Sequence, residues 1–164
     1  MKKIVLITAF FSQILFAQQN DLTIVTKPVT ESNVNYETTL TVNAISGMEN
    51  GFLIEIPAGM KMVPMNVIIN QNELFLQNLN EIPSKETIVC WTLVPEGITL
   101  FFRDGQFSSG DQIVIKTMTT QLKKRFDENP TINIRTVQKN DSSIQYSEDI
   151  KSSANLLLKM KDER

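Results

Sequence analysis

The sequence predicts an all-β protein built as a two-layer sandwich. Runs of β-branched and aromatic residues recur about every 8–12 residues, and clusters of Gly, Pro, Asn and Ser separate them. About eight to ten such runs are typical of a β-sandwich or barrel. The 164 residues contain no visible repeat and no linker that would divide them further. We therefore expect a single sandwich domain over residues 18–164.

The clearest strand spans residues 34–44. Its core-facing positions recur at every second residue: Val34, Tyr36, Thr38, Leu40, Val42 and Ala44. Because successive side chains of a strand point to opposite faces, this period predicts a strand with one buried face. Shorter runs predict further strands at residues 21–27, 52–56, 66–70, 74–76, 131–137 and 144–146.

Residues 86–120 are the expected centre of the core. They contain three apolar runs separated by two turns, the only Trp, the only Cys and three of the nine Phe. Turn residues at 95–97 and 103–110 predict that the three runs form a β-meander. The side chains expected to be mostly buried are Trp91, Leu93, Leu100, Phe102, Ile113, Ile115, Leu40 and Val42.

Two segments fit more than one structure. Residues 121–129 fit a helical turn or a bulging loop. Near the C-terminus, the residues Ile150, Ala154, Leu157 and Leu158 have helical spacing. The apolar run 156–158, together with Met160, also fits a closing strand. We favour the strand and expect no helix longer than about three turns.

The first 17 residues have the pattern of a secretory signal peptide. Lys2 and Lys3 form a basic start, residues 4–16 are almost uninterruptedly apolar, and Ala17 places a small side chain before Gln18. The apolar run is short for a membrane span of roughly 20 residues, although an uncleaved anchor or a buried strand is the alternative. We expect cleavage between Ala17 and Gln18 and export to the periplasm, the cell surface or the extracellular space.

The mature chain, residues 18–164, is mildly acidic. Loss of Lys2 and Lys3 leaves 14 basic residues against 18 acidic ones, a net charge of −4. Nucleic-acid binding needs clustered positive charge, so we expect no nucleic-acid partner. No second apolar run approaches membrane length, and we expect no stable membrane insertion after the signal is removed.

Cys90 is the single cysteine, so no intramolecular disulfide can form. It stands between Val89 and Trp91 in an apolar run, on the opposite strand face from Trp91. This setting favours a buried thiol that packs as a small hydrophobic side chain over a reactive nucleophile.

The usual catalytic sets are missing from the sequence. It contains no His, the common general base and the commonest zinc ligand, and no G-x-S-x-G, P-loop or G-x-G-x-x-G motif. Two carboxylates would suffice for a glycosidase, but no spacing singles out a pair. The carboxylates stand mostly at strand ends or turns: Glu55, Glu73, Glu96, Asp104 and Asp111. We expect no enzymatic activity and no cofactor.

Two groups of residues raise a metal hypothesis. Met60, Met62 and Met65 could offer thioethers to a soft metal such as Cu(I), but packing at a strand corner is the more common role of such methionines. Oxygen ligands for Ca²⁺ could come from Asp104, Gly105, Gly110, Asp111, Asn129 and Asp141. No D-x-D-x-D array accompanies them, so we interpret them as turn residues and expect no metal site.

Two segments carry a resemblance to a known group. Residues 50–60 read Asn-Gly-Phe-Leu-Ile-Glu-Ile-Pro-Ala-Gly-Met, and residues 109–115 read Ser-Gly-Asp-Gln-Ile-Val-Ile. A strand ending in a Pro-x-Gly turn and a later Gly-Asp-x-Ile strand resemble the immunoglobulin-like modules of bacterial secreted proteins, in the cohesin-like and adhesin-repeat group. The resemblance covers about residues 22–137. It implies an immunoglobulin-like β-sandwich with a binding or structural role and no catalytic residue.

Two functions follow as hypotheses. The first is an exported, non-enzymatic sandwich that binds envelope or surface proteins, because a sheet edge can recruit a partner strand through main-chain hydrogen bonds. The second is a carbohydrate- or small-ligand-binding sandwich. That function needs an exposed aromatic platform, for which Trp91, Tyr36, Tyr146 and the phenylalanines are available.

Overall fold

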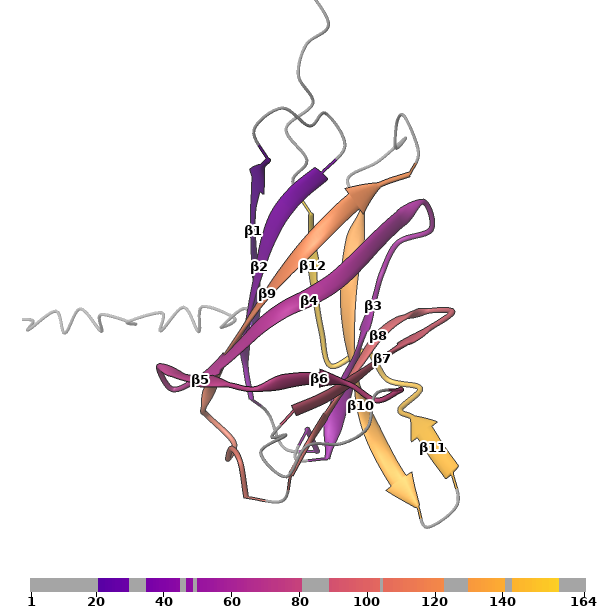
Figure 1. Ribbon diagram of the computed structural model, residues 1–164. Helices are drawn as coiled ribbons and strands as arrows, with labels where there is room; N and C mark the ends of the chain where they lie inside the picture. The colour runs from indigo at the N-terminus through magenta and orange to yellow at the C-terminus, as the bar shows by residue number, and fades with distance from the viewer. Residues whose placement is uncertain are drawn as a thin grey trace, which may run out of the picture.

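The computed structural model describes residues 21–29, 35–44, 47–48, 50–80, 89–103, 105–122, 130–140 and 143–156. All regular elements of these residues are β-strands, twelve in number, and they form two sheets (Figure 1). The expectation of an all-β sandwich is confirmed. There are more strands than the eight to ten expected, and the run predicted at residues 74–76 is divided between two short strands on either side of Phe75.

The first sheet has five antiparallel strands in the order β1-β2-β9-β4-β5. Their bounds are β1 (Leu22–Pro28), β2 (Asn35–Asn43), β9 (Gln112–Gln121), β4 (Met60–Ile69) and β5 (Asn72–Leu74). Strand β2 is the predicted alternating strand. Its buried positions from Tyr36 to Val42 fall at every second residue, as the side-chain period of a strand requires.

The second sheet has the order β11-β10-β3-β8-β7-β6, with β12 also paired to β10. Its strands are β3 (Gly51–Glu55), β6 (Leu76–Asn78), β7 (Val89–Val94), β8 (Gly97–Phe102), β10 (Thr131–Asn140), β11 (Ser143–Tyr146) and β12 (Ser152–Asn155). Strands β6 and β7 are parallel and the other pairs are antiparallel. Strands β12 and β11 follow one another along the edge of β10 that faces away from β3.

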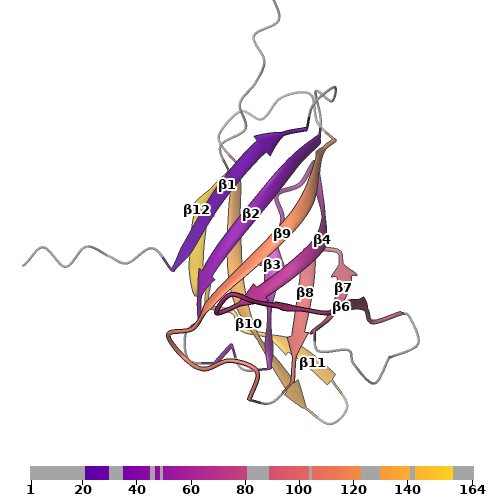
Figure 2. The same ribbon diagram turned by 60° about the vertical axis from the view of Figure 1, so that its left-hand side comes forward.

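The two sheets are joined along one side by a single extended run of chain. A two-residue turn at Asn70 and Gln71, both with positive φ, leads from β4 into β5, as tight hairpins require. At Phe75 the chain leaves the first sheet, and its carbonyl accepts a hydrogen bond from the Val89 N–H at 3.2 Å. The run β5–β6 therefore crosses from one layer to the other, as both views show (Figures 1 and 2).

The core lies between the two sheets. It is lined by side chains from both layers, including the predicted core residues Leu40, Val42, Leu100, Phe102, Ile113 and Ile115, all of which are buried. Trp91 is half-buried and packs against this core. The prediction for Leu93 is wrong, because its side chain is 47% exposed. It lies beside the exposed turn at Pro95 and Glu96, where the β7–β8 hairpin ends and the core stops.

The predicted three-stranded meander is only partly correct. Strands β7 and β8 form a hairpin, but β9 belongs to the other sheet, between β2 and β4. The connection after Phe102 therefore passes from one layer to the other. It carries Phe107 into the core, where the rings of Phe102 and Phe107 meet edge to face with centroids 4.8 Å apart. This buried ring favours a crossover instead of a tight hairpin.

A strand does form near the C-terminus, β12, but it precedes the apolar run at 156–158 for which a closing strand was favoured. Strand β12 pairs with β10, and Leu156 directly after it is fully buried. The rest of the run that suggested a closing strand, residues 157–160, lies outside the described residues. Most of the ambiguous stretch 121–129 lies outside them as well, since β9 ends at Gln121.

Candidate functional site

The outer face of the second sheet carries the side chains that point away from the core. Phe52 and Ile54 of β3 point into the core, so Leu53 and Glu55 between them point outward. The strand register aligns Leu53 with Thr99 of β8 on one side and Arg135 of β10 on the other.

Tyr146 crosses this face from the edge of the sheet. It stands on β11 opposite Val137, yet its hydroxyl lies 3.0 Å from the Thr99 hydroxyl on β8, two strands beyond β10. Its side chain therefore reaches from β11 across the outer face of β10 and β3. Leu53, although on the outer face, is only 2% exposed, and Val137 and Thr99 are also buried. Tyr146 thus covers a small second core on the outside of the sheet.

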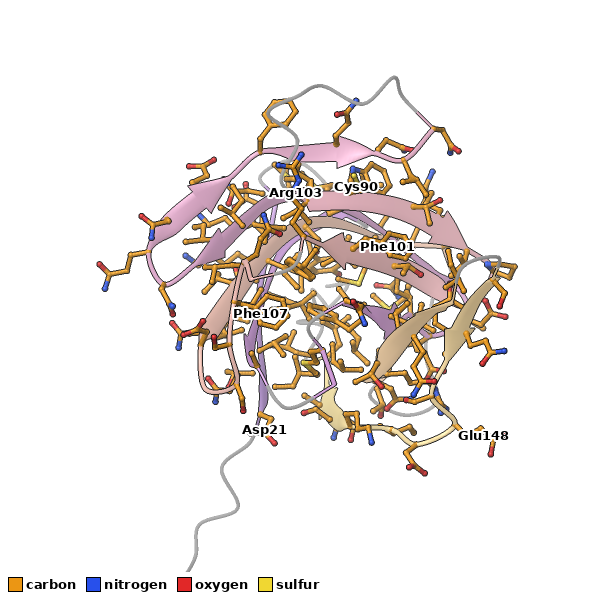
Figure 3. All side chains as sticks on the ribbon, turned by 90° about the horizontal axis from the view of Figure 1, so that it is seen from below. Asp21, Cys90, Phe101, Arg103, Phe107 and Glu148 are labelled. Carbon is orange, nitrogen blue, oxygen red and sulfur yellow. The ribbon has the colours of Figure 1, made fainter. Side chains whose placement is uncertain are left out.

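Arg135 holds an ion-pair network next to this cover. Its Nε donates to Glu55 Oε1 at 2.5 Å, and the second carboxylate oxygen accepts a hydrogen bond from Asn133 Nδ2 at 3.0 Å. The guanidinium also donates to the carbonyls of Ser147 and Glu148. Glu148 itself stands at the rim of the molecule (Figure 3). The network fixes the chain where it leaves β11, so we assign it a structural role.

An apolar strip continues along the same outer face toward β6. We define the strip as Phe75, Leu79, Cys90 and Phe101. The register places Cys90 between Gln77 of β6 and Phe101 of β8, and Figure 3 shows Cys90 and Phe101 on this side of the molecule. Phe75 is 56% exposed and Leu79 47% exposed, while Cys90 and Phe101 are partly exposed.

Cys90 is less buried than the sequence suggested. It does face away from Trp91, as expected, because Trp91 packs inward against the core. Since Cys90 points to the outer face, its thiol is only partly covered by its neighbours. The prediction of a buried thiol is wrong for this reason.

Three hydroxyl groups lie inside the sandwich, and only one of them was predicted from the sequence to face the core. Thr38, Thr117 and Thr119 are buried on the inner face of the first sheet. Thr119 donates to the Thr38 hydroxyl at 2.8 Å, and Thr117 donates to the Thr38 carbonyl at 3.2 Å. Because these hydroxyls bond one another, their burial carries little penalty. Alternation alone had marked Thr38 as core-facing.

The three methionines considered for a soft metal are separated by the fold. Met60 and Met62 point into the core, whereas Met65 is exposed at a β-bulge between Pro64 and Asn66. A bulge inserts one extra residue into a strand and turns its side chain away from the regular alternation. The three sulfur atoms therefore cannot share one metal ion.

The candidate oxygen ligands are only partly within the described chain. Asp111 Oδ2 accepts a hydrogen bond from the Ser108 N–H at 2.7 Å. A hydrogen bond from the Asn70 side chain, together with the Ser108 N–H, lowers the pKa of Asp111. Asp104, Asn129 and Asp141 lie outside the described residues. Within the described chain, no three His, Cys, Asp or Glu side chains gather as a metal site would require.

The proposed cleavage site at Ala17 and Gln18 also lies outside the described residues. Where the chain is described, no helix has the length and apolar character needed to span a membrane.

Comparison with known proteins gives similarity at the level of solved structures. No family model and no curated protein matches the chain. A solved structure, the collagen-binding domain from a Staphylococcus aureus adhesin, is similar over 82% of this chain and 91% of that chain, with 12% sequence identity and a TM-score of 0.42.

Proposed function

We propose that the protein is an exported, non-enzymatic β-sandwich that binds a protein partner, as an accessory or structural subunit of a bacterial envelope or surface complex. The observation that carries the proposal is the exposed apolar strip of Phe75, Leu79, Cys90 and Phe101 on the outer face of the second sheet. Single exposed apolar residues are ordinary, but a row of them on one face is typical of interaction sites.

The strip lies next to a strand edge. Strand β6 pairs with β7 alone among the described strands. The Leu79 N–H donates to the Trp91 carbonyl, and the Val89 N–H donates to the Phe75 carbonyl. The backbone N–H and C=O groups of Phe75, Gln77 and Leu79 therefore point toward β7. In a parallel ladder the backbone groups of the intervening residues, Leu76 and Asn78, then point away from β7. An aromatic anchor beside such an edge suits a protein surface, since large aromatic side chains dominate interface energetics.

The alternative, carbohydrate or small-ligand binding, has weaker support. Trp91 packs against the core, Tyr36 is buried, and Tyr146 lies across the sheet with its hydroxyl bonded to Thr99. Among the described residues, the most exposed aromatic ring is that of Phe75, which has no polar group to bond a sugar hydroxyl. In the described part of the chain, the exposed aromatic surface that this function needs is therefore supplied by phenylalanine alone.

The test compares two sets of variants in a pull-down from envelope extract under mild crosslinking. The double variant Phe75→Asp, Leu79→Asp should reduce the amount of partner protein recovered at least tenfold, because it places two charges in the apolar strip. The control Val25→Asp changes a side chain that is 51% exposed on β1, in the other sheet, and should leave recovery unchanged. Undiminished recovery with the strip variant, or recovery of the protein alone in every case, would count against the proposal.

A further inference from the structure

Arg103 stands at one end of the apolar strip. Strand β8 ends at Phe102, whose ring points into the core, so Phe101 before it and Arg103 after it point to the outer face. Figure 3 shows Arg103 on the same side of the molecule as Cys90 and Phe101. Its side chain is exposed to solvent. The strip therefore carries a positive charge at the end where β8 stops.

The strand register aligns Arg103 with Phe75. Leu76 pairs with Val89, and Val89 pairs with Phe102. Phe75 stands just before this row on β6. Since β8 runs antiparallel to β6, the residue level with Phe75 is the one that follows Phe102, namely Arg103. Because a single strand separates β6 from β8, the two backbones lie about 10 Å apart. One short segment of a partner can therefore contact both side chains.

The backbone of Arg103 is fixed on both sides. Its N–H donates to Gln106 Oε1 at 2.9 Å, and its carbonyl accepts a hydrogen bond from the Gln106 N–H at 3.2 Å. The ring of Phe102, directly before it, stacks on Phe52 with centroids 5.6 Å apart and meets Phe107 edge to face. Arg103 thus projects from a packed turn, and binding through its side chain need not order the backbone, which lowers the entropic cost of association.

The guanidinium of Arg103 has no bonding partner within the described ranges. The hydrogen bonds that Arg103 makes there use its backbone groups. Arg135, the other arginine among these residues, has its guanidinium bound to Glu55 and to two backbone carbonyls. A guanidinium offers five N–H donors in a planar fork, which matches the two oxygens of a carboxylate. Of the two arginines, Arg103 is therefore the one open to a carboxylate from outside.

Covering the strip changes what this charge contributes. An exposed ion pair adds little to affinity, because water screens it. A partner that packs on Phe75 and Phe101 also removes water from around Arg103, and a guanidinium buried without a counter-charge weakens binding. A carboxylate at that point instead forms a charge-assisted pair in a partly dry setting, which is stronger than the same pair in water. The strip and its arginine thus favour an acidic partner over a basic or an uncharged one.

We propose that the apolar strip binds a segment of the partner protein that carries a side-chain carboxylate beside apolar residues. The carboxylate pairs with Arg103, and the apolar side chains cover Phe75, Leu79 and Phe101. The inference rests on the proposed protein-binding function and names the chemistry of the partner at that same site. It also gives Arg103 the role of a contact residue that selects the partner by charge.

A selection from random octapeptides displayed on phage tests this chemistry, with the full-length protein under reducing conditions as the target. Peptides that also bind the double variant Phe75→Asp, Leu79→Asp are removed first, so that those retained depend on the strip. The retained peptides should be enriched in Asp and Glu beside aromatic or aliphatic residues. The same selection on Arg103→Glu should enrich Lys and Arg instead, because the charge at the end of the strip is reversed.

A matched pair of peptides then measures the contribution of the carboxylate. The tightest retained peptide is compared with a copy whose acidic residue is replaced by its amide. The acidic form should bind the unmodified protein at least about tenfold more tightly, and Arg103→Met should reduce that ratio to about twofold or less. The control Lys116→Met removes an exposed cation from β9 in the other sheet and should leave the ratio unchanged. Unchanged melting temperatures should show that both variants fold.

Three results would overturn the inference. They are strip-dependent peptides without an excess of acidic residues, an affinity ratio that survives Arg103→Met, and the absence of any strip-dependent peptide. In each case the pull-down from envelope extract still decides whether the strip binds a protein at all. Recovery that is lost with the strip variant but unchanged by Arg103→Met would leave the proposed function standing without its acidic partner, so the two proposals fail separately.

Discussion

The hydroxyl groups of Tyr146 and Thr99 lie 3.0 Å apart although the two residues are 47 positions apart in the chain. This contact ties the edge strand β11 to the central strand β8 across the outer face of the second sheet. Tyr146 pairs with Val137 and reaches past Leu53 to Thr99, and both Leu53 and Val137 are buried on this outer face. The outer face thus combines a closed, structural half under Tyr146 with an apolar, open half around Phe75.

The Tyr146 cover should contribute measurably to stability. Tyr146→Phe removes one hydrogen bond and should cost about 1 kcal/mol. Tyr146→Ala also uncovers Leu53 and Val137 and should cost about 2–3 kcal/mol, less than for a fully buried aromatic residue. Urea unfolding measures both. A double-mutant cycle with Thr99→Val should show coupling for the Phe variant; additive losses would mean that the hydroxyl pair contributes nothing.

Leu100 and Leu93 offer a matched comparison on paired strands. Leu100 is fully buried on β8, and Leu93 is 47% exposed on β7. Leu100→Ala should destabilise the fold by about 2–5 kcal/mol, because it leaves a cavity in the core. Leu93→Ala should cost less than about 1 kcal/mol. Similar losses for the two variants in denaturant unfolding would contradict the placement of Leu93 outside the core.

Acid should remove part of the stability through Asp111. Hydrogen bonds from Asn70 and the Ser108 N–H lower the pKa of this carboxyl in the folded protein. A lowered folded pKa means that the contribution is present above the unfolded pKa of about 3.9 and is lost as pH falls through the folded value. Asp111→Asn should therefore flatten the fall in stability below about pH 5. An unchanged pH profile of the unfolding midpoint would contradict this account.

Export should leave a defined N-terminus. Signal peptidase accepts small residues before the cut, so cleavage after Ala17 should give a mature chain that begins at Gln18. Leu15 is larger than ideal for that site, so processing should be slow. Intact-mass measurement of protein from the envelope fraction checks both points, with Ala17→Phe as the blocked control. A species that retains residues 1–17 in the unmodified protein would indicate an anchor instead of a signal.

The features that could be predicted from the sequence are those that depend on local residue patterns. Alternation over residues 34–44 gave strand β2 and its buried face, including Thr38. Turn residues located the β7–β8 hairpin correctly. These features depend on the period of side chains along one strand and on backbone conformations that few residues accept.

Long-range pairing was beyond the reach of the sequence. Strand β9 joins the first sheet instead of pairing with β8, and this crossover depends on Phe107 entering the core. The apolar character of a run does not determine which of the two sheets the strand joins. The cover over Leu53 depends on Tyr146, which approaches from a strand that local patterns place far away. The apolar strip likewise arises only because the parallel pairing of β6 and β7 brings Phe75 and Leu79 beside Cys90.

The most direct test of the account is a photocrosslinking comparison in the living source cell. A photoreactive benzoylphenylalanine is placed at Phe75 in one variant and at Val25 in the other, two apolar positions with 56% and 51% exposure in different sheets. If the apolar strip binds a protein partner, a discrete crosslinked species should form from position 75 and not from position 25. Identical patterns from both positions, or no adduct from position 75, would contradict the central claim.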